Sequence, residues 1–289
     1  MPINYDALMN LRMPPVEQTL DSRDIILYAL GVGLGANPLD PNELRYVYEE
    51  GLQALPTMAM VLCYGTHVTG FPDTGITRTH VVHGEQGLEM DRPLPITGTL
   101  IGQARVIDVI DKGEGKGALV YTETTLTDKA SGARICTLNS TTFCRADGGF
   151  GGPLESKNGP ARPVHALPQR APDATCDLPS LPQAALIYRL SGDYNPLHAD
   201  PAYAKRAGFD RPILHGRCTF GVAGHALIKL GCGDDPTRLL AMQGRFSAPV
   251  YPGETIRTEV WREGSNISYR ATVPARGATV ISNGQARVA

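Results

Sequence analysis

Two long stretches of the chain alternate between apolar and polar positions and are rich in β-branched residues, a pattern typical of half-buried β-strands. In the first stretch, the pattern predicts strands near Thr99–Ile110, Ala118–Thr127 and Arg134–Arg145. In the second, it predicts strands near Leu239–Ser247, Thr255–Arg262, Ile267–Val273 and Ala278–Val288. Glycine-containing turns separate neighbouring strands, so each stretch predicts an antiparallel sheet.

Helical spacing precedes the strands in both halves of the chain. The predicted helical segments are Asp21–Gly33, a segment that starts at Asp40-Pro41, Gln183–Leu190 and Arg217–Leu230. Ser180 with Gln183 resembles a capping box for the third of these. The last is amphipathic, with apolar residues on one face. Helices followed by antiparallel strands, twice along the chain, predict an α+β fold in which each half wraps a sheet around a helix.

The two halves also resemble each other in their turn residues. His83–Gln86 leads to Pro93 and then to Gly98, five residues further on, whereas Gln243–Phe246 leads to Pro249 and to a glycine four residues later. This similarity favours a degenerate internal repeat, although two unrelated β-rich segments with similar turns stay an alternative. A segment dense in Gly and Pro connects the halves, so we expect units at 1–147 and 175–289 with a linker at 148–174.

Composition narrows the class of protein. The chain has 289 residues, of which 42% are hydrophobic and 19% charged, and its net charge is -2. This balance is that of an ordinary globular protein and gives no reason to expect a nucleic-acid or membrane partner. The six cysteines form no CxxC pair. We therefore expect reduced, mostly buried thiols in a reducing compartment, with a cytoplasmic location, no signal peptide and no membrane-spanning segment.

The residues with the most suggestive chemistry lie between Tyr188 and Gly216. Asp193, Asn195 and His198 share one short irregular turn, and the pair His215-Gly216 follows. An acid, an amide and an imidazole at this spacing can hold one water molecule and move two protons. This is the equipment for adding water to a polarised double bond or for removing it.

Hydration of a 2-enoyl thioester needs a base, an acid and a donor for the thioester oxygen. Asp193 and His198 can supply the first two, while Asn195 can hold the water. Gly216 lies at the expected start of a helix, where its free backbone N–H and the helix dipole suit an enolate oxygen. Two alternatives stay open: a capped turn without catalytic role, and a metal site formed by Asp193, His198 and Asp200.

Two further positions are candidate ligand contacts. His83 and Gly84 occupy the repeat-equivalent turn of the first half. Lys112 lies at a glycine-rich hairpin tip, where it either contacts a phosphate or is simply solvated.

The motif YRLSGDYNPLH followed by FDRPILHG resembles the signature of the hydratase 2 family, the (R)-specific 2-enoyl-CoA hydratases with a MaoC-like double hot-dog fold. The similarity extends to LHGRCTFG, RFSAPVYPGETI and VISNGQA, and in the first half to HGEQ, RPLP and VIDKGEG, so it covers nearly the whole chain.

The resemblance implies catalysis by Asp193, His198 and Asn195 with Gly216 as oxyanion donor, and no cofactor or metal. It implies acyl-CoA contacts at His83, Gly84, Lys112, Tyr194, Phe246 and Glu50, with Asn195 among them and Glu49 as an alternative to Glu50. It also implies a homodimer in which the first half accommodates the acyl chain. The apolar run Leu55–His67 is the expected lining of that pocket.

The function expected from these observations is the reversible hydration of trans-2-enoyl-CoA to (3R)-3-hydroxyacyl-CoA. A hot-dog acyl-CoA thioesterase is the alternative within enzymes, because the same oxyanion donor would serve hydrolysis. A non-catalytic acyl-CoA-binding protein is the third possibility, and the intact acid, amide and imidazole argue against it.

Overall fold

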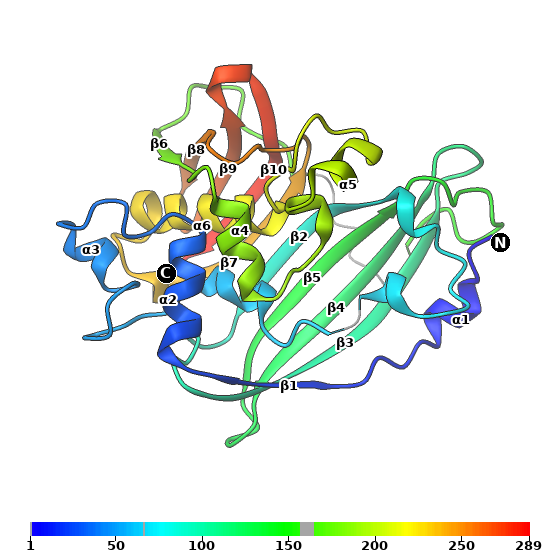
Figure 1. Ribbon diagram of the computed structural model, residues 1–289, viewed down its shortest axis with the longest axis horizontal. Coiled ribbons are helices and arrows are strands. Elements are labelled where there is room, and N and C mark those ends of the chain that lie inside the picture. Colours follow the sequence, from blue (N-terminus) through cyan, green and yellow to red (C-terminus); the bar gives the residue numbers. More distant parts are fainter. Residues whose placement is uncertain (1, 66, 157–164) are drawn as a thin grey trace.

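The computed structural model describes residues 2–65, 67–156 and 165–289. Its main element is one ten-stranded sheet with the strand order β1-β3-β4-β5-β2-β7-β10-β9-β8-β6 (Figure 1). The strands of the first half are β1 Val16–Leu20, β2 Val81–Met90, β3 Gly98–Asp111, β4 Ala118–Asp128 and β5 Arg134–Cys144. Those of the second are β6 Ala174–Pro179, β7 Leu239–Phe246, β8 Thr255–Glu263, β9 Asn266–Val273 and β10 Ala278–Val288.

The sheet consists of two five-stranded halves with the same topology. Read from the middle outwards, β2-β5-β4-β3-β1 in the first half corresponds to β7-β10-β9-β8-β6 in the second. The two halves join where β2 pairs antiparallel with β7, with Glu85 opposite Arg245. The internal repeat expected from the sequence is therefore present in the strand order.

The seven strands predicted from alternation are all present, whereas β1, β2 and β6 were not predicted. The most consequential omission is β2, because the segment around His83-Gly84 was expected to be a turn. It is instead part of a strand at the centre of the sheet, with a register shift against β5 between His83 and Glu85. Gly84 suits this irregularity, since a Cβ there would lie 3.2 Å from the carbonyl oxygen of Thr141.

The helices are short except for two. They are α1 Tyr5–Met9, α2 Ser22–Gly31, α3 Pro41–Leu44, α4 Ala184–Tyr188, α5 Pro201–Arg206 and α6 Gly216–Gly231. A capping box formed by Asp21 and Asp24 starts α2. The capping box expected at Ser180 is absent: its hydroxyl donates to the carbonyl oxygen of Glu254 instead, and α4 begins at Ala184 without a side-chain cap.

The two halves differ in what fills their concave side. In the second half the helix α6 does so, and every residue from Cys218 to Ile228 is buried, so the helix is enclosed all round rather than on one face. In the first half the 3₁₀ helix η1 Pro56–Val61 packs against β2 and β5 and contacts α6. The helix that packs on the sheet is therefore a short 3₁₀ helix in the first half and the long α6 in the second.

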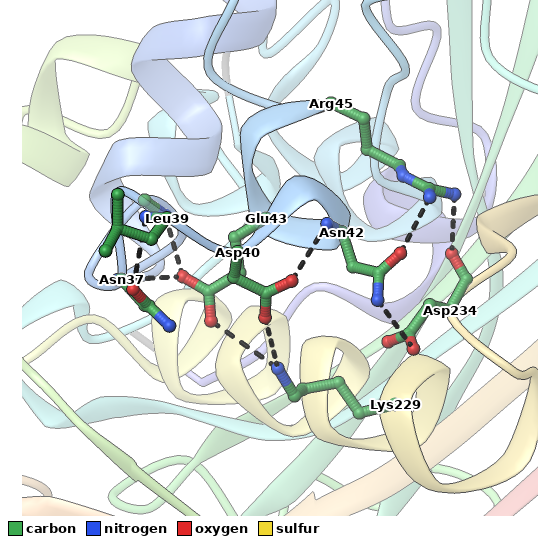
Figure 2. A network of polar contacts seen from close by, with 9 residues as sticks. Asn37, Leu39, Asp40, Asn42, Glu43, Arg45, Lys229 and Asp234 are labelled. Atoms are coloured by element: carbon green, nitrogen blue, oxygen red, sulfur yellow. Dashed lines mark hydrogen bonds and ion pairs between the residues drawn. The ribbon is translucent and has the colours of Figure 1, made fainter.

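Polar contacts fasten the first half to the end of α6 (Figure 2). Lys229 lies 3.5 Å from the buried carboxylate of Glu43 and 3.7 Å from that of Asp40, which caps α3. Arg45 donates to the backbone carbonyl of Asp234 just beyond the helix. Because Glu43 also accepts from two backbone N–H groups, its buried charge is well compensated.

The connection between the halves has no regular structure in the parts that are described, and 157–164 of the expected linker lie outside the described residues. Its beginning packs on the β3–β4 hairpin, where Asp111 accepts from the N–H groups of Gly149 and Gly151. All six cysteines are free thiols, five of them buried. Within the described part of the chain, none of the helices combines the length and apolar composition needed to cross a bilayer.

Candidate active site

The turn that carries the acid, the amide and the imidazole is built by its own side chains. Gly192, with a φ of 131°, ends the 3₁₀ helix η4 Arg189–Ser191. Asp193 then accepts from the N–H of Asn195 at 3.2 Å, and Asn195 accepts from the N–H of Leu197, which caps the 3₁₀ helix η5 Pro196–His198. The capped turn is thus present, and its hydrogen bonds hold the three candidate side chains in place.

His198 is fixed in one tautomer by a backbone contact. Its ring is 7% exposed, and Nδ1 lies 2.8 Å from the carbonyl oxygen of Ile213. Because a carbonyl can only accept, Nδ1 carries the hydrogen and Nε2 keeps its lone pair. Burial lowers the pKa of His198, while the Ile213 contact and the carboxylate of Asp193 act in the opposite direction. His198 is therefore a neutral imidazole at pH 7.

His215 packs against the ring of His198 and contacts the same turn. Its ring stacks on that of His198 with 3.7 Å between ring centroids, and its Nε2 donates to the carbonyl oxygen of Asp193 at 3.1 Å. Burial, followed by the neighbouring His198, lowers the pKa of His215 to about 3. The sequence marked His215 only as the residue before Gly216. Its contacts with both halves of the turn were not foreseen.

Gly216 is the first residue of α6, so its backbone N–H has no partner within the helix. A Cβ at this position would lie 3.4 Å from the ring of Phe246. The ring of His83 also packs against that of Phe246, with 4.7 Å between ring centroids, and its Nε2 is hydrogen-bonded to the Ser140 hydroxyl at 3.0 Å. The structure thus brings His83 and Phe246 together beside Gly216.

Three predicted substrate contacts lie further out. Tyr194 is 57% exposed, and the guanidinium of Arg189 stacks over its ring at 4.8 Å. Lys112 is exposed at the β3–β4 hairpin, and Glu50 is exposed in the turn region after α3. Within the described part of the chain, no hydrogen bond or ion pair joins the side chain of Lys112 or Glu50 to the catalytic turn, so their roles stay predictions.

A cavity of about 90 Å³ lies in the first half, where η1 replaces a central helix. Its lining includes Met60 and Leu62 from the run Leu55–His67 that the sequence suggested. Polar side chains line it as well, namely His67, Gln86, Thr122, Thr124, Ser140 and Arg217. Arg217 follows Gly216 directly, so the cavity adjoins the candidate site. Arg217 was not among the candidate site residues named from the sequence.

The carboxylate and imidazoles of the site also form the one cluster of metal-ligand type found among the described residues. Donor atoms of Asp193, His198 and His215 lie within 4.8 Å of one another. Asp200, which the sequence offered as a third ligand, instead caps α5. The stacked imidazole rings keep their lone pairs in nearly parallel planes, whereas a metal needs ligands that converge on one point. The arrangement therefore suits proton transfer better than metal binding.

Comparison with known proteins finds relatives over nearly the whole chain. The family model described as MFE-2 hydratase 2 N-terminal domain matches residues 19–146, and the one described as MaoC like domain matches residues 163–283. Peroxisomal enoyl-CoA hydratase 2 of Arabidopsis thaliana is 40% identical, over 96% of this chain and 94% of its own length. Peroxisomal multifunctional enzyme type 2 of Mus musculus is 38% identical over 94% of this chain, which spans 37% of that enzyme.

A solved structure agrees with these sequence matches. The crystal structure of a MaoC-like dehydratase from Phytophthora capsici superimposes with a TM-score of 0.86 and 36% identity, and the match covers 99% of both chains. The double hot-dog fold and the resemblance found in the motifs are thereby confirmed. The chain belongs to the hydratase 2 family of MaoC-like dehydratases.

Proposed function

We propose that this protein catalyses the reversible addition of water to trans-2-enoyl-CoA, giving (3R)-3-hydroxyacyl-CoA. The observation that carries the proposal is the site itself. Neutral His198 and the carboxylate of Asp193 lie on one fixed turn, next to the free N–H of Gly216 at the start of α6. Two relatives that match the chain almost completely are named enoyl-CoA hydratases.

The reaction distributes two proton transfers over this pair. The Nε2 lone pair of His198 and the carboxylate of Asp193 face the water, and the pair removes one proton as the hydroxyl group adds to C3. A proton then returns from the pair to C2, so both side chains end in their original states. The two groups titrate as a coupled pair, so the two proton transfers are assigned to the pair and not to either residue alone. Meanwhile Gly216 donates to the thioester oxygen, where negative charge develops.

Thioester hydrolysis is not favoured, since the relatives of the chain carry the names of hydratases and a dehydratase. One assay separates the possibilities. A hydratase lowers the ultraviolet absorbance of the enoyl thioester, a thioesterase releases free thiol, and a binding protein does neither.

The product is expected to have (3R) configuration, and the reaction is expected to need no metal. The fold fixes the face of the double bond that Asp193 and His198 approach, and the stacked imidazole rings argue against a bound ion. Chiral chromatography of the hydrated crotonyl-CoA product tests the first expectation, and assays after chelator treatment test the second. Mainly (3S) product, or loss of activity that zinc restores, would contradict the respective expectation.

The acyl chain, we propose, enters the cavity of the first half while the chemistry stays in the second. Met60 lines this cavity, and Ala104 on β3 faces it from the sheet. Ala59, in contrast, is fully buried without lining it, so a larger side chain there would disturb the core instead.

Folded Met60→Trp and Ala104→Phe variants are expected to lose most activity on trans-2-hexenoyl-CoA and to keep activity on the shorter crotonyl-CoA. The added rings fill space that only the longer chain needs. The ratio of kcat/KM for the two substrates measures this effect, with folding checked by circular dichroism. An unchanged ratio in both variants would place the acyl chain elsewhere.

A homodimer and a cytoplasmic location are further proposals. Free, mostly buried thiols support a reducing compartment. Light scattering on the purified protein tests the oligomeric state, and fractionation of the source cells tests the location.

A further inference from the structure

The cavity of the first half has more polar lining residues than a purely hydrocarbon tail would need. Thr122 and Thr124 are two residues apart on β4 and therefore point to the same face of the sheet, toward the cavity that both line. Ser140 on β5 and Gln86 on β2 add further polar groups. Inward positions of a sheet normally carry apolar side chains, so this concave face departs from the usual pattern.

The cavity also carries a permanent positive charge. Of the described residues that line it, Arg217 alone comes from the second half. Its Nη1 donates to the carbonyl oxygen of Met60 at 3.1 Å, and its guanidinium stacks over the ring of Tyr64 at 4.7 Å. These two contacts hold the charge at the cavity wall, one residue beyond Gly216.

No carboxylate forms an ion pair with Arg217 within the described part of the chain, and the carboxylate of Asp193 acts on the same neighbours, Tyr64 and His67, only at longer range. None of the ion pairs found there includes Arg217, and its Nε is buried without a hydrogen-bond partner. The nearby imidazoles are neutral, since burial and then Arg217 lower the pKa of His67 to about 4 and that of His83 well below its usual range. A partly buried cation without a counter-ion is costly unless a ligand supplies one.

We infer that Arg217 selects 2-enoyl-CoA thioesters whose short acyl chain ends in a carboxylate, which the cavity receives. This inference rests on the proposed hydratase function and names the substrate class of the same site. A guanidinium binds a carboxylate through charge-assisted hydrogen bonds. The hydroxyl and amide groups of the wall add polar partners to a lining in which apolar side chains such as Met60, Leu62 and Leu138 predominate. The volume of about 90 Å³ leaves space for only a few atoms beyond the reacting carbons.

The test compares two substrates of equal length that differ in charge, trans-2-hexenedioyl-CoA and trans-2-hexenoyl-CoA, with crotonyl-CoA as the reference. We expect the wild-type protein to prefer the carboxylated substrate in kcat/KM by about tenfold or more. In Arg217→Leu the preference is expected to fall by on the order of tenfold to a hundredfold, mainly through KM, while hexenoyl-CoA is still hydrated. Arg217→Lys should keep part of the preference, because it keeps the charge and loses the fork geometry.

Arg105→Leu is the matched control. Arg105 lies next to Ala104 on β3, but its side chain is 69% exposed and pairs with Glu123 outside the cavity. Its removal is expected to leave the substrate preference unchanged.

The inference is overturned if the wild-type protein hydrates hexenoyl-CoA as well as or better than hexenedioyl-CoA. It is also overturned if Arg217→Leu, folded by circular dichroism, keeps the wild-type ratio, because Arg217 would then only tie α6 to η1. The wild-type comparison needs no variant, so misfolding of Arg217→Leu does not affect it. If crotonyl-CoA, hexenoyl-CoA and hexenedioyl-CoA are all left unhydrated, the proposed function itself has failed.

Discussion

Asp193→Asn and His198→Gln are each expected to lower the rate of crotonyl-CoA hydration at least about a hundredfold while the protein stays folded. Asn keeps the acceptor that holds the N–H of Asn195 at 3.2 Å but cannot take a proton. The imidazole of His198 is neutral because burial lowers its pKa, so its Nε2 lone pair can accept a proton. Gln has an amide at this place, which cannot accept one. Both replacements therefore remove proton transfer and leave most of the turn in place.

Steady-state rates measured by loss of enoyl-thioester absorbance check this expectation. Asp200→Asn is the matched control for the acid, since Asp200 caps α5 through two backbone N–H groups and asparagine caps equally well. His80→Gln is the control for the imidazole, because His80 is exposed at the end of the 3₁₀ helix η3 Arg78–His80. Near-normal turnover by folded Asp193→Asn or His198→Gln would remove that residue from the mechanism.

Gly216→Pro is expected to lower kcat by about a hundredfold to a thousandfold, as loss of one oxyanion donor does elsewhere. Proline at this position deletes the backbone N–H and adds a ring, whose Cβ would lie 3.4 Å from the ring of Phe246. Gly216 is the first residue of α6, where proline is tolerated, and the preceding His215 has φ -58° and ψ 135°, the extended geometry that proline requires. The helix should therefore form as before, without its donor to the thioester oxygen.

Gly216→Ala separates the donor from the effect of bulk. Alanine keeps the N–H and adds a methyl group 3.4 Å from the ring of Phe246, a contact that a small shift of the ring relieves. We expect a modest loss in this variant, well below that of Gly216→Pro. Equal losses in the two folded variants would mean that space beside Phe246, and not the N–H, is what the reaction needs.

Much of the fold could be predicted because its signals are local. The seven predicted strands alternate in a way that depends only on neighbouring residues, and α6 was located to within a residue at each end. The strand β2 was missed because its sequence, VVHGEQGLEM, has two glycines and no regular alternation. It becomes a strand because β5 and β7 supply partners on both sides, which no local pattern reveals.

The turn with the candidate catalytic residues was equally readable, since Asp193, Asn195 and His198 fall within six residues and their own hydrogen bonds shape the turn. The surroundings of the turn depend on contacts that are distant in sequence. His215 reaches back to the carbonyl oxygen of Asp193, and His83 meets Phe246 across the β2–β7 junction.

The sequence by itself therefore determined the turn residues that indicate the repeat, most strands and the candidate reactive groups, because each of these is encoded within a few consecutive residues. The tertiary structure decided three further matters: which tautomer His198 adopts, what replaces the central helix of the first half, and that Arg217 faces a polar cavity there. Each depends on side chains that meet only when the two halves pack together. The free energy of burial and pairing at such contacts is a property of the assembled fold and leaves no periodic pattern along the chain.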